Sequence, residues 1–117
     1  MIVLDTSVVI KWYNEENGTD SALKIQKAHI QNRLKITFPD LILYELANAV
    51  RYSPANDIGE LRAILDNFNR LKFNIIIPTI AMIKDAGELA FRYNITVYDA
   101  MYLALAQHYE LRICHGR

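Results

Sequence analysis

The chain alternates between short apolar runs and longer segments in which apolar residues recur at helical spacing. Four apolar runs of strand length occur at residues 1–4 (MIVL), 34–39 (LKITFP), 73–78 (FNIIIP) and 111–114 (LRIC). A short apolar run bounded by polar residues is typical of a strand that is covered on both faces. The pattern therefore predicts four strands, the second of which ends at Pro39 because proline cannot continue a ladder.

The segments between these runs are predicted to be helices. They cover residues 7–13, a segment with Thr19 or Asp20 as its N-cap, and residues 40–52, 57–71, 79–93 and 100–109. Alternating strands and helices predict a three-layer α/β/α sandwich with a central parallel sheet of four to five strands. A chain of 117 residues fits one such domain, spanning 1–117.

Two of these helices carry more specific signals. In residues 40–52 we expect Leu41, Tyr44, Ala47 and Val50 to form the stripe that faces the core. The helix at 57–71 opens with Asp57 and Glu60, which have the spacing of a capping box. Its apolar stripe predicts core packing, although such a face also suits the amphipathic helix of a partner. That stripe consists of Leu61, Ile64, Leu65, Phe68 and Leu71.

Composition and charge exclude several classes of protein. With 52% hydrophobic and 22% charged residues, the chain is not expected to be disordered. Its formal net charge of zero argues against a protein that simply coats nucleic acid. A single cysteine allows no internal disulfide, no apolar run is long enough to span a membrane, and no export signal is recognised, so we expect a cytoplasmic protein. Several basic residues are scattered without a patch in the sequence: Lys11, Lys24, Lys27, Arg51 and Arg92.

Three isolated acids lie where predicted strands end and helices begin. Asp5 follows the first strand directly, Glu45 lies in an apolar helix after the second, and Asp99 precedes a nearly apolar helix. Ligands of open α/β sheets bind outside the carboxyl ends of the strands. Each acid also has a plain alternative: Asp5 as a helix N-cap, Glu45 as an exposed helix position, and Asp99 in a capping pair with Thr96.

The three acids together favour a metal site. Converging carboxylates repel one another unless a divalent cation lies between them, and ligands that are all oxygen favour Mg²⁺ or Mn²⁺. Such an ion polarises a phosphoryl oxygen and lowers the pKa of an attacking water. Phosphodiester hydrolysis is therefore the chemistry that these residues predict.

In this order and spacing, three segments resemble the PIN-domain proteins, and among them the VapC-type toxins of prokaryotic toxin–antitoxin pairs. The segments are MIVLDTSVVI, PDLILYELANAV and ITVYDAMYLALA. The resemblance implies a PIN fold, an endoribonuclease that depends on Mg²⁺ or Mn²⁺, frequent homodimerisation, and inhibition by a small cognate antitoxin protein bound across the active-site groove. No membrane partner is implied.

The resemblance also assigns roles to individual residues. Asp5, Glu45 and Asp99 correspond to the metal-binding and catalytic acids, and Thr6 or Ser7 lies near the metal or the scissile phosphate. Asn48, three residues after Glu45, is expected on the same helical face, where it can orient that carboxylate.

The chain departs from the family at its C-terminal end. Relatives commonly carry a Thr-x-Asp turn that supplies a fourth acid, whereas His115 and Arg117 stand at those positions here. The chain thus resembles either a family member without its usual C-terminal end or a variant that works with three acids. Both readings predict weakened metal binding and slow or absent cleavage.

Two alternative functions stay open. A degenerate PIN fold would bind an antitoxin or RNA without cleaving it. A different α/β phosphotransfer domain is disfavoured, because Asp5 is followed by Thr6 and Ser7 rather than by a second nearby acid. The histidines His29 and His108 and the cysteine Cys114 are predicted to be structural. Trp12 and Tyr13 are expected to complete the edge of the core, with RNA or antitoxin contact as the alternative.

Overall fold

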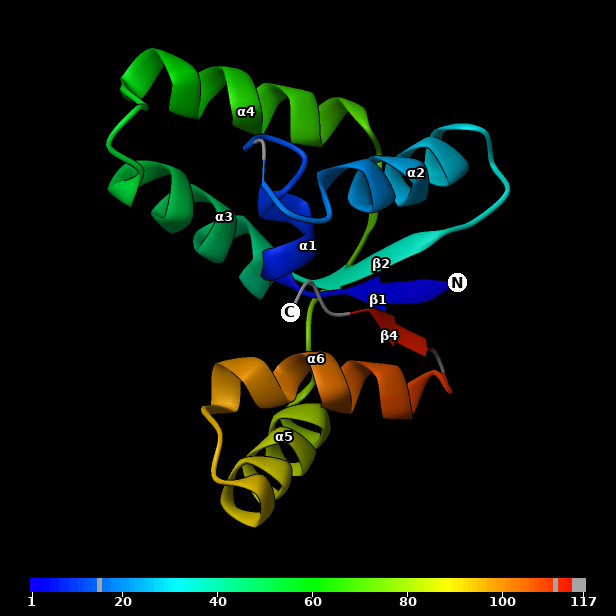
Figure 1. The fold of residues 1–117 in the computed structure, drawn as a ribbon. Helices are drawn as coiled ribbons and strands as arrows, with labels where there is room; N and C mark the ends of the chain where they lie inside the picture. Colours follow the sequence, from blue (N-terminus) through cyan, green and yellow to red (C-terminus); the bar gives the residue numbers. More distant parts are fainter. Residues whose placement is uncertain (15, 111, 115–117) are drawn as a thin grey trace.

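The computed structural model describes residues 1–14, 16–110 and 112–114, and these form a sheet with helices on both faces (Figure 1). In chain order the elements are β1 (Ile2–Leu4), α1 (Thr6–Ile10), α2 (Thr19–Ile30), β2 (Ile36–Pro39), α3 (Leu41–Tyr52), α4 (Ile58–Arg70), β3 (Asn74–Ile76), α5 (Ile80–Tyr93), α6 (Val97–His108) and β4 (Arg112–Cys114). None of the described helices has the length and apolar character needed to cross a membrane.

The sheet is parallel throughout, with the strand order β3-β2-β1-β4. β1 lies inside the sheet, where Ile2 pairs with Ile36 on one side and with Arg112 on the other. Helices α1 to α4 cover one face, and α5 and α6 cover the other (Figure 1). The three-layer sandwich with a central parallel sheet is confirmed, and the described residues supply four of its strands.

Two hydrophobic layers hold the sheet. On the face of α1 to α4, the core contains Phe38 of β2, Ile42 of α3 and Phe68 of α4, and the Phe38 and Phe68 rings lie 5.5 Å apart. On the other face, α5 and α6 pack through small residues such as Ala86 and Ala100. Small side chains let two helices approach closely, so this pair forms a tight unit under the sheet.

Two helix predictions were wrong in detail. The N-cap of α2 is Gly18, not Thr19 or Asp20, and its φ of 86° is a left-handed conformation that glycine adopts without strain. The predicted stripe of α3 was correct at Val50, which is buried, and wrong at Tyr44, which is 74% exposed, because Ile42 and Leu46 are buried instead. The helix is rotated toward its other apolar positions, since both faces of this sequence are hydrophobic.

The ends of two other helices also shift. α1 begins at Thr6 and ends at Ile10, and α6 begins at Val97 rather than at residue 100. The Asp57 cap of α4 is confirmed, because its Oδ1 accepts the Glu60 N–H at 2.9 Å. Ile64 and Phe68 of the predicted stripe of α4 are buried in the core.

The structure also bears on the other residues that the sequence analysis named. His29 is buried and bonded on both ring nitrogens, as expected of a structural histidine. Trp12 stacks on Phe73 with ring centroids 5.5 Å apart and packs against the core, as predicted for a residue that completes the edge of the core. The side chain of Cys114, and residues His115 and Arg117, lie outside what the structure describes, so the prediction about a missing fourth acid stays a prediction.

Candidate active site at the carboxyl edge of the sheet

Asp5 directly follows the central strand β1 and is only 6% exposed. It is the N-cap of α1: its Oδ1 accepts the Ser7 backbone N–H at 3.0 Å and a short hydrogen bond from the Ser7 hydroxyl. The alternative prediction, that Asp5 is a helix N-cap, is therefore confirmed. This role does not exclude a second one, because a carboxylate has about four acceptor positions.

Glu45 lies in the second turn of α3, where its carboxylate joins three helices. Its Oε1 accepts the Thr6 hydroxyl at 2.7 Å and the Tyr102 hydroxyl at 2.5 Å, and the two hydroxyl oxygens are 3.0 Å apart. Thr6 belongs to α1 and Tyr102 to α6, so the three residues are brought together by the fold alone. We call Thr6, Glu45 and Tyr102 the hydroxyl–carboxylate network. It fixes the orientation of the Glu45 side chain.

Tyr102 remains protonated in this network. Its side chain is 3% exposed, and burial raises its pKa far above the ordinary value of 10. The hydrogen bond to Glu45 and the negative charges of Glu45 and Asp5 raise this pKa further, while the bond with Thr6 opposes them. The Tyr102 hydroxyl thus donates to Glu45, and both Asp5 and Glu45 lie within electrostatic reach of it.

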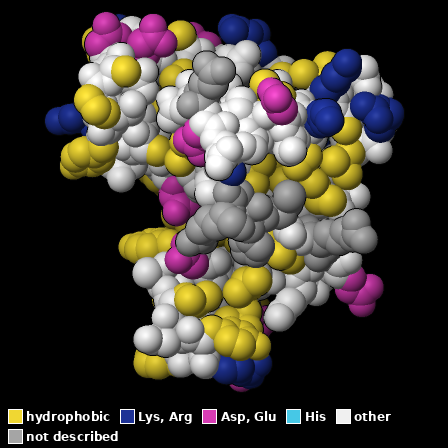
Figure 2. Space-filling model, viewed as in Figure 1, with side chains coloured by type: hydrophobic (Ala, Val, Ile, Leu, Met, Phe, Trp, Pro, Cys, Tyr) yellow, Lys and Arg dark blue, Asp and Glu magenta, His cyan; other side chains and the backbone are white. Residues whose placement is uncertain are grey.

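The remaining predicted residues lie around this network. Asp99 is exposed at the start of α6, where its backbone N–H is capped by Thr96 Oγ1 at 3.0 Å. It precedes Tyr102 by three residues, so the two side chains share one side of the helix. Asn48 is exposed, one turn after Glu45 on α3. Figure 2 shows acidic side chains between the starts of α3 and α6, on the left side of the view.

The donor set fits a divalent cation, with one restriction. Among the described residues, no group of three or more His, Cys, Asp or Glu side chains is close enough together to hold a metal ion. Mg²⁺ is commonly held by one or two carboxylates together with water and substrate phosphates. Asp5 and Glu45 are candidates for such a pair, because both act electrostatically on the Tyr102 hydroxyl, and Asp99 is exposed at the start of α6.

The sequence analysis missed Tyr102. It lies in an apolar helix, where a tyrosine is readily interpreted as a core residue. A signal was available, since a buried tyrosine hydroxyl needs a polar partner and Tyr102 is one turn beyond Asp99. The same reasoning could not have identified Glu45 as that partner, because the two residues are 57 positions apart.

Comparison with known proteins relates the chain to one family. The family described as "PIN domain" matches residues 2–114. A curated relative, Ribonuclease VapC3 of Pyrobaculum aerophilum, is 28% identical over 115 residues, which cover 91% of this chain and 81% of the relative.

Two solved structures share the fold. The structure of Mycobacterium tuberculosis VapC20, described as a sarcin-ricin loop cleaving toxin, matches with a TM-score of 0.73 and 14% identity. That match covers 95% of this chain and 85% of VapC20. A DNA-bound VapBC from Salmonella typhimurium matches with a TM-score of 0.61 and 15% identity over the full length of both chains.

Proposed function

Because the chain belongs to the PIN-domain family, we propose that it is a VapC-type toxin endoribonuclease that hydrolyses RNA phosphodiesters with Mg²⁺ or Mn²⁺ in the cytoplasm. The observation that supports the proposal is that Asp5 and Glu45 both act electrostatically on the hydroxyl of Tyr102 at the carboxyl edge of the sheet. Glu45 also accepts hydrogen bonds from the hydroxyls of Thr6 and Tyr102. The likeness to Ribonuclease VapC3 supports the choice of RNA as the substrate.

Each side chain has a distinct part in this mechanism. Asp5 and Glu45 would hold the cation, and Asp99 at the start of α6 would be a further ligand. A bound cation neutralises phosphate charge and lowers the pKa of an attacking water. Tyr102 and Thr6 keep Glu45 in one orientation, and Ser7 holds Asp5, so the carboxylates need not reorganise when RNA arrives. Asn48 is placed to contact a metal-bound water or the RNA.

The substitution Asp5→Asn tests the assignment. Asparagine is as good an N-cap as aspartate, so α1 should persist while the negative charge is lost. We expect Mn²⁺-dependent cleavage of RNA to fall on the order of 1,000-fold, which corresponds to about 4 kcal/mol. The matched control is Asp66→Asn, which removes an exposed acid on α4. Cleavage that survives Asp5→Asn at the level of the control would remove Asp5 from the mechanism.

We also propose two protein partners. The likeness to the VapBC assembly supports a small antitoxin that covers the active-site groove. A second copy of the chain is supported by large apolar side chains left exposed on α5 and α6, of which Phe91 is 93% exposed. Apolar side chains of this kind are yellow in Figure 2. Sedimentation of the purified chain tests the dimer, and a monomer at every concentration would contradict it.

A second candidate function is a degenerate PIN module that binds an antitoxin or RNA without cleaving. The observation that favours it is that the described residues form no cluster of three metal ligands. Calorimetric titration with Mn²⁺ separates the two candidates. Site-specific binding that is lost in Asp5→Asn supports the nuclease, and the absence of any specific binding supports the module.

A further inference from the structure

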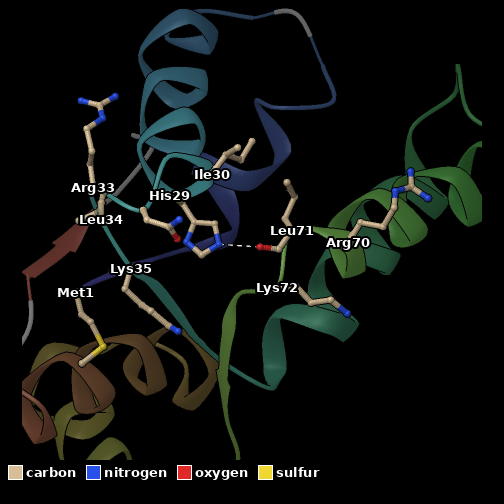
Figure 3. Close-up of a pocket in the computed structure, with 10 residues that line it drawn as sticks. Met1, His29, Ile30, Arg33, Leu34, Lys35, Arg70, Leu71 and Lys72 are labelled. Atoms are coloured by element: carbon tan, nitrogen blue, oxygen red, sulfur yellow. Dashed lines mark hydrogen bonds between the residues drawn. The ribbon is translucent and has the colours of Figure 1, made fainter.

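A pocket of about 620 Å³ lies at the opposite, amino edge of the sheet. Met1 before β1, the loop between α2 and β2, and the loop after α4 line it (Figure 3). His29 forms its floor: Nδ1 accepts the Ile36 N–H at 3.2 Å, so the ring proton is on Nε2, which donates to the Leu71 carbonyl at 2.7 Å. This histidine is fully bonded and holds the two loops together.

The rim of the pocket is strongly basic. Four of the 13 Lys and Arg residues of the chain line it, namely Arg33, Lys35, Arg70 and Lys72, and none of the described acidic residues does. All four are exposed, and none forms an ion pair with a carboxylate in the part of the chain that the structure describes. The carboxyl edge of the sheet, by contrast, carries the carboxylates of Asp5 and Glu45.

The usual preference for basic residues near helix C-termini explains only part of the cluster of four cations at this pocket. Basic residues are favoured in the last turn of a helix, and Arg70 occupies such a position at the end of α4. Arg33 and Lys35, however, lie in the loop after α2, outside any helix. Lys72 lies beyond α4 with a φ of 54°, a left-handed conformation that lysine rarely adopts. Helix capping therefore does not account for the pocket.

The arrangement of the charged groups indicates an extended anion. In Figure 3 the side chains of Arg33, Arg70 and Lys72 point in different directions around His29 and Leu71, and do not converge on one point. A single small anion would contact only part of this rim. A chain of phosphates can contact all of it, and each neutralised phosphate releases counterions.

We propose that this basic pocket is a second RNA-binding site, which holds the phosphate backbone of the substrate away from the scissile bond. The inference rests on the proposed ribonuclease function and deepens it. The acidic edge repels phosphates except where a cation lies, so the affinity for RNA comes from another part of the surface. Met1 and Asp5 are separated by four residues of extended chain, about 13 Å at roughly 3.3 Å per residue, so only RNA longer than a dinucleotide reaches both edges.

The test compares two variants of the full chain with the same loss of charge. The pocket variant is Arg33→Gln, Lys35→Gln, Arg70→Gln and Lys72→Asn, because asparagine tolerates the left-handed backbone at position 72. The control variant replaces four exposed cations elsewhere, namely Lys24→Gln, Lys27→Gln, Arg62→Gln and Lys84→Gln. Fluorescence anisotropy of a labelled RNA hairpin is measured over a salt series in EDTA, so the result does not depend on cleavage.

We expect the pocket variant to bind the hairpin on the order of 100-fold more weakly, with the slope of log K against log salt reduced by about 3. The control variant should lose no more than a few-fold. Equal losses in both variants would overturn the proposal, because they would reflect net charge alone. Displacement of RNA by polyglutamate as effectively as by competitor RNA would assign the pocket to an acidic polypeptide instead. Displacement by inorganic phosphate at equal phosphate concentration would overturn the extended-backbone assignment.

A cleavage measurement then connects the two edges. With Mn²⁺ present, the pocket variant should have a raised KM for the hairpin and an unchanged kcat, whereas cleavage of a dinucleotide should be unaffected. An unchanged KM for the hairpin would contradict the proposal. If the native chain cleaves neither substrate, the nuclease proposal fails while the binding result stands by itself.

Discussion

The two edges of the sheet are built in opposite ways. At the carboxyl edge, Asp5 and Tyr102 are buried, and Glu45 is fixed by two short hydrogen bonds. At the amino edge, cations such as Lys35 and Arg70 are exposed around an open pocket. Buried, bonded groups suit chemistry that needs precise geometry, and exposed cations suit the binding of a flexible polyanion. The contrast agrees with the proposal that one edge provides the reaction and the other the affinity for RNA.

After Asp5→Asn, the largest effect is expected from Asp99→Asn, which tests whether an exposed residue takes part in the chemistry of the buried edge. If Asp99 completes the surroundings of the cation, RNA cleavage should fall about 100-fold or more. The free energy of unfolding should change little, because the cap of α6 is formed by Thr96 and the Asp99 backbone N–H. Asp85→Asn on α5 is the matched control, and equal activity of the two variants would confine the chemistry to Asp5 and Glu45.

Tyr102→Phe removes a donor to Glu45 and leaves the ring in place. We expect cleavage to fall about 10- to 100-fold, as is common when a partner that orients a metal ligand is lost. Binding of the RNA hairpin in EDTA should be unchanged, because the amino edge is intact. Tyr98→Phe, on an exposed position of the same helix, serves as the control. A loss of hairpin binding in Tyr102→Phe would contradict the separation of the two edges.

Alkaline pH should weaken the carboxyl edge through Tyr102. Because the folded pKa of Tyr102 lies above its ordinary value of 10, the folded chain keeps this proton while the unfolded chain loses it, so stability falls as pH rises above 10. The slope reaches about 1.4 kcal/mol per pH unit. In urea unfolding between about pH 9 and 11, the free energy of unfolding should decline more steeply with pH for the native chain than for Tyr102→Phe. Equal declines in the two chains would argue against a buried hydroxyl at Tyr102.

Tyr13 should add a smaller effect of the same sign, since burial raises its pKa to about 12. Its hydroxyl donates to Asn67 at 2.6 Å, away from the network of Glu45. Tyr13→Phe is therefore a useful second control. It should reduce the alkaline loss of stability without affecting cleavage.

The smallest effect is expected at the amino edge. Lys35→Gln should change the free energy of unfolding by no more than about 0.5 kcal/mol, because its side chain is exposed and has no ion-pair partner among the described residues. Thr6→Val, by contrast, leaves a bonded carboxylate short of a donor and should cost about 1 to 3 kcal/mol. Similar losses of stability in these two variants would contradict the difference between the two edges of the sheet.

Local signals in the sequence predicted most of the fold. Short apolar runs located the strands, and Asp57 with Glu60 located the start of α4, because these signals depend on neighbouring residues alone. The buried side of α3 could not be predicted in full, since large side chains such as Leu43 and Tyr44 alternate with Ile42 and Leu46 along the helix. Which of them is buried depends on the position of the helix over the sheet.

The candidate active site and the basic pocket also differ in how far the sequence predicts them. Asp5, Glu45 and Asp99 stand out as isolated acids in apolar surroundings, so their sequence positions drew attention. The bond between Glu45 and Tyr102 joins residues far apart in the chain and required the structure. The basic pocket was invisible in the sequence, because Lys35 and Lys72 come from separate loops that only the fold brings together.

The contact between the hydroxyls of Thr6 and Tyr102 joins residues 96 positions apart, which has a consequence for the timing of synthesis. At about 5 to 20 residues per second, a ribosome needs roughly 5 to 20 s to pass from one partner to the other. During that interval Glu45 lacks a donor that orients it, and α6 is not yet present to close the site. On the proposed function, the nuclease site is therefore incomplete until Tyr102 has emerged, late in synthesis.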